Sequence, residues 1–204
     1  MIFLYNLNQM EDTMTKNKLQ FPELIPIINT ERLILKQANA SDAVDMHTYL
    51  SDECVRRYMG IHPYESIQET KKEIKWYENI FKEQTGIRWG ISLKDDPKII
   101  GSCGFLNISK ANMRAEIGYE LHRKFWGKGL MSEALANILQ YGFKDMNINR
   151  IEALVEPENI ASLKLLENFH FVKEGLLRQY EYGTGKYDDL YMYSLLNEEF
   201  IRSE

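Results

Sequence analysis

The sequence predicts one α/β domain built on a mixed β-sheet with helices packed on its faces. Segments in which apolar and polar residues alternate are interleaved with segments whose apolar residues recur every three or four positions. The predicted order is strand, two helices, three strands, helix, strand, helix and two strands. Seven strands and about four helices intermixed in this way favour a single sheet with helices on its faces. We place this domain at residues 28–204, after an N-terminal arm at residues 1–27.

Composition narrows the class of protein. The 204 residues suffice for one sizeable domain, and 44% apolar with 27% charged residues is typical of a soluble globular protein. A net charge of −5 argues against broad nucleic-acid binding, and no apolar run approaches the ~20 residues that a membrane helix needs. Cys54 and Cys103 show no paired spacing, and the four histidines show no metal spacing. We therefore expect a cytoplasmic protein without a bound metal, a nucleic-acid partner or a membrane partner.

The boundaries of most elements follow from local signals. Ser41 or Asp42 is the expected N-cap of the first helix, and Gly86 ends the second. The predicted strands span residues 30–37, 87–93, 98–108, 113–121, 149–155, 171–182 and 186–195. The predicted helices run to about residue 50, over 66–84, from Leu130 to about 145, and over 157–169.

A basic, glycine-containing turn joins the strand that ends at Leu121 to the helix that begins at Leu130. The first turn of a helix has backbone N–H groups without partners, its dipole adds partial positive charge, and glycines let a ligand approach the backbone. The turn is therefore a candidate site for a phosphate-bearing ligand, although tight turns alone also select glycine. Ser132 and His122 stand where the dinucleotide and Walker motifs require glycine, which excludes both.

Four motifs follow one another in a specific order. They are Thr30-Glu31-Arg32-Leu33, Ala115-Glu116-Ile117-Gly118-Tyr119, Trp126-Gly127-Lys128-Gly129, and Asn159-Ile160-Ala161-Ser162 leading to His170-Phe171. With these motifs the chain resembles the GNAT acyltransferase family over about residues 28–197, and within it the ribosomal-protein N-acetyltransferase-like branch. The resemblance implies a mostly antiparallel seven-stranded sheet flanked by about four helices, and acetyl-CoA as cosubstrate without a metal.

The resemblance also implies a set of residues that contact acetyl-CoA. The pyrophosphate would lie on the backbone of the turn, and the pantetheine arm would pair with a bulged strand near Leu121. Lys124 departs from the glutamine or arginine that opens this loop in the family. Asn159 would contact the pantetheine, or serve as a helix N-cap, or both. The full implied set is Leu121, Arg123, Lys124, Phe125, Trp126, Gly127, Lys128, Gly129, Leu130 and Asn159.

Two side chains are the implied catalytic candidates. Glu116 matches a strand glutamate that serves as base in some relatives, and its alternative is a surface or salt-bridged glutamate on the outward, polar face of the strand with Arg114 and Glu120. Ser162 would donate a hydrogen bond to the departing sulfur, because Leu166 stands where many relatives carry an acidic tyrosine. The alternative for Ser162 is a helix serine bonded to backbone. Cys103 is expected to be a core thiol.

The predicted function is acetyl transfer from acetyl-CoA to a primary amine, by direct attack in a ternary complex. One candidate acceptor is the N-terminal amine of a ribosomal protein. Alternatives are a small amine, such as an amino acid, polyamine or antibiotic, or a non-catalytic acyl-CoA-binding module. The tyrosines of the terminal hairpin are expected to pack in the sheet, with Tyr182 or Asp189 as candidates for the wall of the acceptor site, and the tyrosine-rich hairpin suggests a homodimer.

Overall fold

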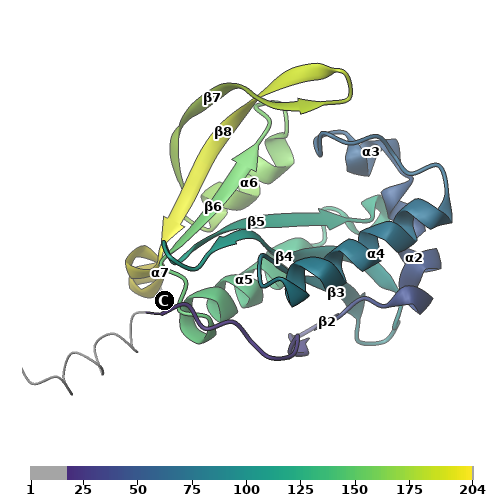
Figure 1. The fold of residues 1–204 in the computed structure, drawn as a ribbon, viewed down its shortest axis with the longest axis horizontal. Helices are drawn as coiled ribbons and strands as arrows, with labels where there is room; N and C mark the ends of the chain where they lie inside the picture. Colours follow the sequence, from purple (N-terminus) through teal and green to yellow (C-terminus); the bar gives the residue numbers. More distant parts are fainter. Residues whose placement is uncertain (1–17, 204) are drawn as a thin grey trace, which may run out of the picture.

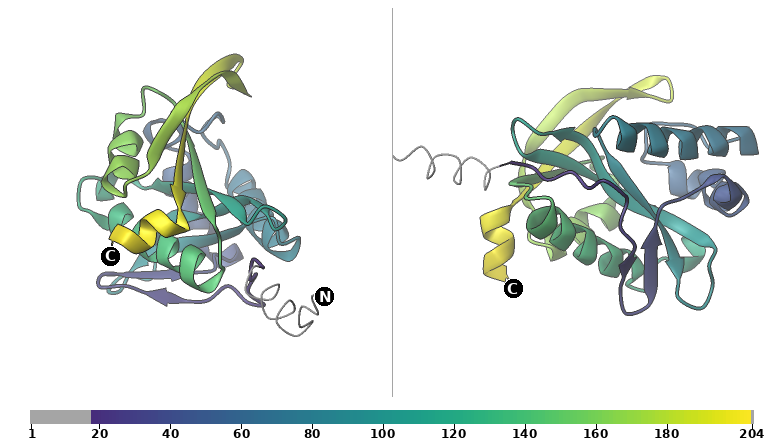
Figure 2. Two further views of the ribbon diagram at one scale, coloured as in Figure 1. Left: turned by 90° about the vertical axis from the view of Figure 1, so that its left-hand side faces the viewer. Right: turned by 60° about the horizontal axis from the view of Figure 1, so that its bottom comes forward.

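The computed structural model describes residues 18–203 of the chain as one eight-stranded sheet with helices on both faces (Figures 1 and 2). The strand order across the sheet is β1-β2-β3-β4-β5-β6-β8-β7. The strands are β1 (Ile28–Asn29), β2 (Leu33–Lys36), β3 (Ile87–Leu93), β4 (Ile99–Ser109), β5 (Arg114–Leu121), β6 (Arg150–Val155), β7 (Val172–Gly183) and β8 (Lys186–Leu196). The helices are α2 (Ala43–Leu50), α3 (Glu53–Arg56), α4 (Ile67–Lys82), α5 (Leu130–Gln140), α6 (Ile160–Asn168) and α7 (Asn197–Ser203). Three short helical turns adjoin these helices. The turn η1 (Ala40–Asp42) leads into α2, η2 (Arg123–Phe125) lies before α5, and η3 (Tyr141–Asp145) directly follows α5.

The predicted mixed, mostly antiparallel sheet is confirmed, and its strand number is corrected from seven to eight. The additional strand, β1, has two residues and is therefore too short to show an alternating pattern. Helices α3 and α7 were not predicted either, because four and seven residues carry little periodicity. Between residues 18 and 203, no helix combines the length and the apolar character needed to cross a bilayer.

Asp42 stands at the N-cap position of α2, as predicted, but its side chain makes no capping hydrogen bond there. The side-chain cap belongs instead to the preceding turn η1, where Asn39 Oδ1 accepts a hydrogen bond from the backbone N–H of Ser41 at 2.9 Å. The Asp42 carboxylate accepts one from the backbone N–H of Asn39 at 2.8 Å, which completes a capping box around η1. The helix α2 begins only after this turn.

One pair of neighbouring strands is parallel, and its pairing is short. β5 and β6 pair over three positions, from Arg114 opposite Arg150 to Glu116 opposite Glu152. Beyond Glu116, β5 stays paired with β4 as far as Leu121, and β6 stays paired with β8 as far as Val155. The facing edges of β5 and β6 therefore separate, and the sheet opens toward the C-terminal end of β5.

Apolar side chains fill both faces of the sheet. The larger cluster packs α5 against the strands, and Trp89 and Cys103 are fully buried within it. A smaller cluster lies under α2 and α4, around Met46 and Tyr77. The prediction that Cys103 is a core thiol is confirmed. Trp89 is also in the core, whereas Trp76 on α4 keeps 41% of its surface exposed.

The described part of the predicted arm is packed against the domain. The indole N–H of Trp89 donates to the carbonyl of Pro26 at 2.8 Å, and the backbone N–H of Gln20 donates to the carbonyl of Met146 at 2.8 Å. Phe21 and Ile25 rest on the larger core cluster. Residues 1–17, the greater part of the predicted arm, lie outside the described residues.

A polar contact spans the last three strands. Arg150 on β6 donates from Nη1 and Nη2 to the Glu174 carboxylate on β7, at 2.7 and 2.9 Å. Ser194 on the intervening strand β8 donates to the same carboxylate at 2.6 Å. The Arg150 hydrogen bonds first, and then that of Ser194, lower the pKa of Glu174 from 4.5 to about 2.

We expect the Glu174→Gln variant to lose stability in a pH-dependent way. Because the folded pKa lies below the unfolded one, the charged carboxylate stabilises the fold above pH 4.5, and this contribution disappears as the pH falls toward 2. At pH 7 the free energy of unfolding should fall by less than ~1 kcal/mol, as for other exposed ion pairs. Urea unfolding at pH 7 and pH 3 measures the difference. The control is Glu23→Gln, an exposed carboxylate, and an equal loss at both pH values would contradict the assignment.

Candidate active site

A cleft of about 1130 Å³ occupies the opening between β5 and β6. Its walls include Ile117–Leu121 of β5, Ala153–Val155 of β6, the N-terminal turns of α5 and α6, the α3 region and part of β7. The strand edges of β5 and β6 at this point carry backbone N–H and C=O groups that no neighbouring strand pairs with. An extended ligand can therefore hydrogen-bond along β5 as a strand would.

The turn that leads into α5 fits an anion. Gly127 and Gly129 adopt φ values of 70° and 73°, in the left-handed region that favours glycine. Within the described residues, the backbone N–H groups from residue 127 to residue 132 have no hydrogen-bond partner, and the helix α5 then continues for eleven residues. Unpaired N–H groups and the positive end of the helix dipole lie together at this turn, as a pyrophosphate requires.

The first strand region braces this turn. The Glu133 carboxylate in the first turn of α5 accepts hydrogen bonds from Thr30 Oγ1 at 2.5 Å, Arg32 N at 2.7 Å and Arg32 Nε at 2.6 Å. Arg32 Nη1 also donates to the carbonyl of Lys128 at 3.0 Å. Burial opposes the charge on Glu133, but the hydrogen bonds from Thr30 and Arg32 outweigh it and lower the pKa of Glu133. These contacts give the Thr30-Glu31-Arg32-Leu33 motif its physical role.

The residues predicted for the turn divide into two groups. Phe125, Trp126, Gly127, Gly129 and Leu130 line the cleft together with Leu121. The indole N–H of Trp126 donates to the Leu121 carbonyl at 2.6 Å, so that carbonyl is already engaged.

Arg123, Lys124 and Lys128 are not among the residues that line the cleft. Arg123 pairs with Asp52 at 3.0 Å, and the ammonium of Lys128 lies 5.3 Å from the centroid of the Phe125 ring. The side chains of Arg123 and Lys128 therefore make contacts outside the cleft, and the backbone of the turn is the candidate anion site, as the sequence predicts.

Asn159 and Ser162 lie together at the start of α6 and line the cleft. Asn159 Oδ1 accepts a hydrogen bond from the backbone N–H of Ser162 at 3.2 Å, which confirms the helix N-cap interpretation. Ser162 is 7% exposed, and Leu166 is fully buried in the core.

Tyr119 adds a side chain that the sequence analysis did not identify. Its hydroxyl lies 2.5 Å from Ser162 Oγ, so β5 and α6 are joined by a pair of hydroxyl groups inside the cleft. Burial raises the pKa of Tyr119 well above its usual value, with the Ser162 hydrogen bond partly opposing this, so the phenol keeps its proton at neutral pH. A tyrosine on the apolar face of an alternating strand is the signal that could have found it, because its buried hydroxyl needs a partner.

Glu116 lies on the opposite face of β5 from Tyr119 and also lines the cleft. Its Oε2 accepts a hydrogen bond from Asn107 Nδ2 at 2.8 Å. Arg114 is bound to Glu152 at 2.5 Å, so the described structure shows no ion pair between Arg114 and Glu116.

The predicted bulge is on a different strand. β5 pairs with β4 in continuous register from Glu116 to Leu121, and the register shift falls in β4 between Leu106 and Ser109. Asn107, inside this bulge, has a φ of 48° and uses its side chain to hold Glu116. Bulges re-aim side chains next to functional sites, and this one aims Asn107.

A buried ion pair lies on the Glu116 face of β5. Arg88 Nη2 and Glu120 Oε2 are 2.5 Å apart, with side chains 4% and 3% exposed, and both residues line the cleft. Ser102 donates to Glu120 and accepts from Arg88, and Tyr77 donates to Glu120 at 3.3 Å. The sequence analysis took Glu120 as outward-facing. An arginine inside the mostly apolar strand β3 was the sequence signal that a buried partner for its charge must exist.

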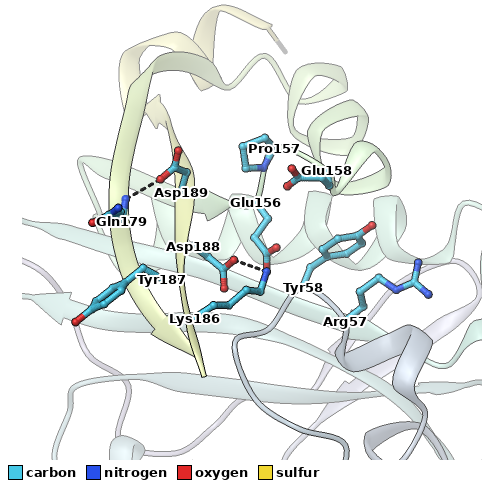
Figure 3. A pocket seen from close by; sticks show the side chains of 10 residues that line it. All are labelled: Arg57, Tyr58, Glu156, Pro157, Glu158, Gln179, Lys186, Tyr187, Asp188 and Asp189. Atoms are coloured by element: carbon cyan, nitrogen blue, oxygen red, sulfur yellow. Dashed lines mark hydrogen bonds and ion pairs between the residues drawn. The ribbon is translucent and has the colours of Figure 1, made fainter. Parts of the chain in front are cut away.

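The two candidates for the acceptor wall lie in different cavities. Tyr182 lines the main cleft. Asp189 lines a second cavity of about 610 Å³ beneath the β7–β8 hairpin, where its carboxylate accepts from the backbone N–H of Gln179 at 2.7 Å (Figure 3). Arg57 and Tyr58 line both cavities.

Comparison with known proteins now identifies the family. The sequence profile of the acetyltransferase (GNAT) domain matches residues 32–172, more than half of the chain. The chain belongs to the GNAT acetyltransferase family. The predicted family and its ribosomal-protein N-acetyltransferase-like branch are thereby confirmed, and this GNAT chain is an acetyl-CoA-dependent N-acetyltransferase.

Individual relatives cover most of this GNAT chain. An uncharacterized N-acetyltransferase, p20, of Bacillus licheniformis is 45% identical over 171 residues, which span 84% of this chain and 96% of the relative. The ribosomal protein uS5-alanine N-acetyltransferase of Escherichia coli (strain K12) is 27% identical, over 79% of this chain and 86% of the relative. A solved structure of RimL, a ribosomal L7/L12 alpha-N-protein acetyltransferase, in complex with coenzyme A is similar in fold, with a TM-score of 0.73. Its sequence is 25% identical, and the match covers 87% of this chain and 99% of that one.

We expect the Glu133→Gln variant to bind acetyl-CoA less tightly. Loss of the carboxylate charge weakens three hydrogen bonds that hold the turn, so the KM for acetyl-CoA should rise about tenfold while kcat changes less than about twofold. Steady-state thiol release measures both constants. The matched control is Glu78→Gln, which removes a carboxylate paired with Lys75 on the surface of α4. A drop confined to kcat would show that Glu133 does not brace the donor site.

Proposed function

We propose that this GNAT enzyme acetylates the α-amine of a peptide or protein N-terminus, by direct attack with donor and acceptor bound together. The observation that carries the proposal is the free edge of β5 beside the cleft, with Ser162 and Tyr119 on one face of the strand and Glu116 on the other. The names of the uS5-alanine and L7/L12 alpha-N-protein acetyltransferases, which act on protein acceptors, support this class of acceptor.

The donor would lie along β5 with its pyrophosphate at the start of α5. Acetyl-CoA supplies the acetyl group as an activated thioester. The N–H groups from residue 127 to residue 132 would hold the pyrophosphate, and Asn159, whose Oδ1 caps α6, retains its amide N–H groups for the pantetheine. Backbone N–H groups near Leu121 would polarise the thioester carbonyl, which contributes about 2–4 kcal/mol in comparable sites.

Glu116 would act on the amine that attacks. An α-amine has a pKa near ~8 and is partly neutral at physiological pH, whereas a lysine amine near ~10.4 is not. The α-amine therefore needs only a group that accepts one proton as the new bond forms. Glu116, which lines the cleft and is held by Asn107, would accept that proton directly or through a water molecule.

Ser162 and Tyr119 would act on the sulfur that departs. The Tyr119 phenol can donate to Ser162 Oγ, which leaves the serine proton free to point at the sulfur. Hydrogen bonds in such a chain polarise one another, so the serine becomes a better donor. These two hydroxyl groups would together do what a single acidic tyrosine does in many relatives, at the position where this chain has Leu166.

The protonation state of the buried thiol of Cys103 agrees with direct transfer of the acetyl group from acetyl-CoA to the amine. Cys103 is fully buried, and burial raises its pKa to about 12, so it stays a thiol at neutral pH. A thiol in that state is not a nucleophile for an acyl-enzyme. We expect mass spectrometry during turnover to find no acetylated enzyme, and an acetyl adduct that forms and decays at the rate of turnover would rule out direct transfer.

The acceptor class is tested by thiol release from acetyl-CoA across a panel of amines. We expect peptides with a free N-terminal amine to release thiol at least ten times faster than the same peptides with a blocked N-terminus and an internal lysine. Spermidine and free amino acids complete the panel. Faster release with spermidine than with any peptide would assign the enzyme to small amines, and no release with any amine would reject the proposed function.

We expect three substitutions in the cleft to lower kcat and to leave the KM for acetyl-CoA within about twofold. Glu116→Gln and Ser162→Ala should each lower kcat about 10- to 100-fold, and Tyr119→Phe about five- to tenfold. If Tyr119 acts through Ser162, the double variant should be no slower than Ser162→Ala alone. Tyr187→Phe, on the exposed end of the hairpin, is the control. Additive losses in the double variant would show that the two hydroxyls act independently.

A further inference from the structure

The guanidinium of Arg88 is a fixed group in the wall of the cleft. Its Nη2 donates to Glu120 and to Ser102, and its Cζ lies 5.3 Å from the centroid of the Tyr77 ring. Glu120 is in turn held by Ser102 and Tyr77. An arginine held in this way loses little conformational freedom when it binds a further group.

The other side of this guanidinium has no partner. Arg88 Nη1 makes no hydrogen bond within the described residues, and Nε is buried and unpaired. The side chain is nevertheless 96% buried, at 4% exposed, in the wall of the cleft. Unlike Nε, Nη1 is not fully buried, so it reaches the surface of the cleft, where its N–H groups can donate to an incoming oxygen acceptor.

Gly118 keeps this donor uncovered. A Cβ atom at residue 118 would lie 2.8 Å from Arg88 Nη1, which is closer than real Cβ contacts allow. Gly118 itself lines the cleft, and it stands two residues from Glu116 on the same face of β5. Residues two apart in a strand are separated by about 7 Å, so the proposed base and the free N–H group address neighbouring parts of one acceptor.

The charge at this point favours a neutral or anionic oxygen. Glu120 balances the charge of Arg88, so the pair offers a hydrogen-bond donor without a net field that would draw a cation. In an amino acid or peptide, the carbon that bears the α-amine is bonded to a carbonyl carbon, whose oxygen belongs to a peptide or amide group or, in a free amino acid, to a carboxylate. A polyamine or an alkylamine carries no such oxygen.

We propose that Arg88 Nη1 selects the acceptor, by donating a hydrogen bond to the carbonyl or carboxylate oxygen of the residue whose α-amine is acetylated. This inference rests on the proposed function and adds to it a residue that distinguishes α-amines from other primary amines. Sites built to hydrogen-bond an oxygen discriminate strongly against analogues that lack it, because the buried donor is then left unpaired.

The test compares two acceptors in two variants. Gly118→Ala places a methyl group over Nη1 and leaves Arg88, Glu120 and Ser102 in place. For alaninamide we expect kcat/KM to fall about 10- to 100-fold in this variant, and for isopropylamine, which lacks the oxygen, less than about threefold. Wild-type enzyme that does not use isopropylamine at all would agree with selection for the oxygen. Gly175→Ala, a strand glycine with open space around it, is the matched control.

Arg88→Lys provides a second measurement, with thermal melting to confirm that the variant folds. It keeps the charge opposite Glu120 but loses the fork that reaches Gly118, and we expect the same loss for alaninamide alone. Free alanine in place of alaninamide distinguishes carboxylate from carbonyl recognition. Equal losses for both acceptors, or no loss in Gly118→Ala, would overturn the inference while thiol release still supports the proposed function. Absence of release with every amine would instead reject the proposed function itself.

Discussion

The strands β5 and β6 pair in parallel over only three positions, and this short pairing joins the β1–β5 part of the sheet to the β6–β8 part. The candidate active site depends on where that pairing ends. Beyond Glu116 each strand continues against its other neighbour only. An unpaired strand edge is usually a liability, because it invites pairing with another chain. Here the edge lies inside the molecule, next to the positive end of α5, so the ligand best suited to it is an extended chain that ends in phosphate groups.

The alternation of β5 separates two tasks on one strand. Tyr119 faces α6 and meets Ser162, whereas Glu116 and Gly118 face α4 and meet Asn107 and Arg88. Neighbouring side chains of a strand point in opposite directions, so a donor lying along the free edge would have Tyr119 and Ser162 on one side and Glu116 and Arg88 on the other. A register slip of one residue would exchange the two sets, and the continuous pairing of β5 with β4 prevents it.

The sequence alone predicts the helices and strands whose apolar residues recur with a clear period, and it predicts the glycine turn between β5 and α5. It missed β1 and α3, which are too short to show a period, and the cap at Asn39, which belongs to an intervening turn. In the site, Asn159 and Ser162 were found through the family motif. Tyr119 and Glu120 were not, because alternation reports which face a side chain occupies and not which helix or strand lies opposite. The partners of these residues are 43 positions away at Ser162 and 32 positions away at Arg88.

The contact between Arg32 and Glu133 also constrains when the site can form during folding. These residues are 101 positions apart, and they join the first strand region to the start of α5, where the glycine turn ends. Closing so long a loop comes at an entropic cost and favours late formation, after the local elements are in place. A chain that has folded its C-terminal half alone would contain α5 and its glycines without this brace. Competence to hold the donor is thus acquired only when both ends of the domain have come together.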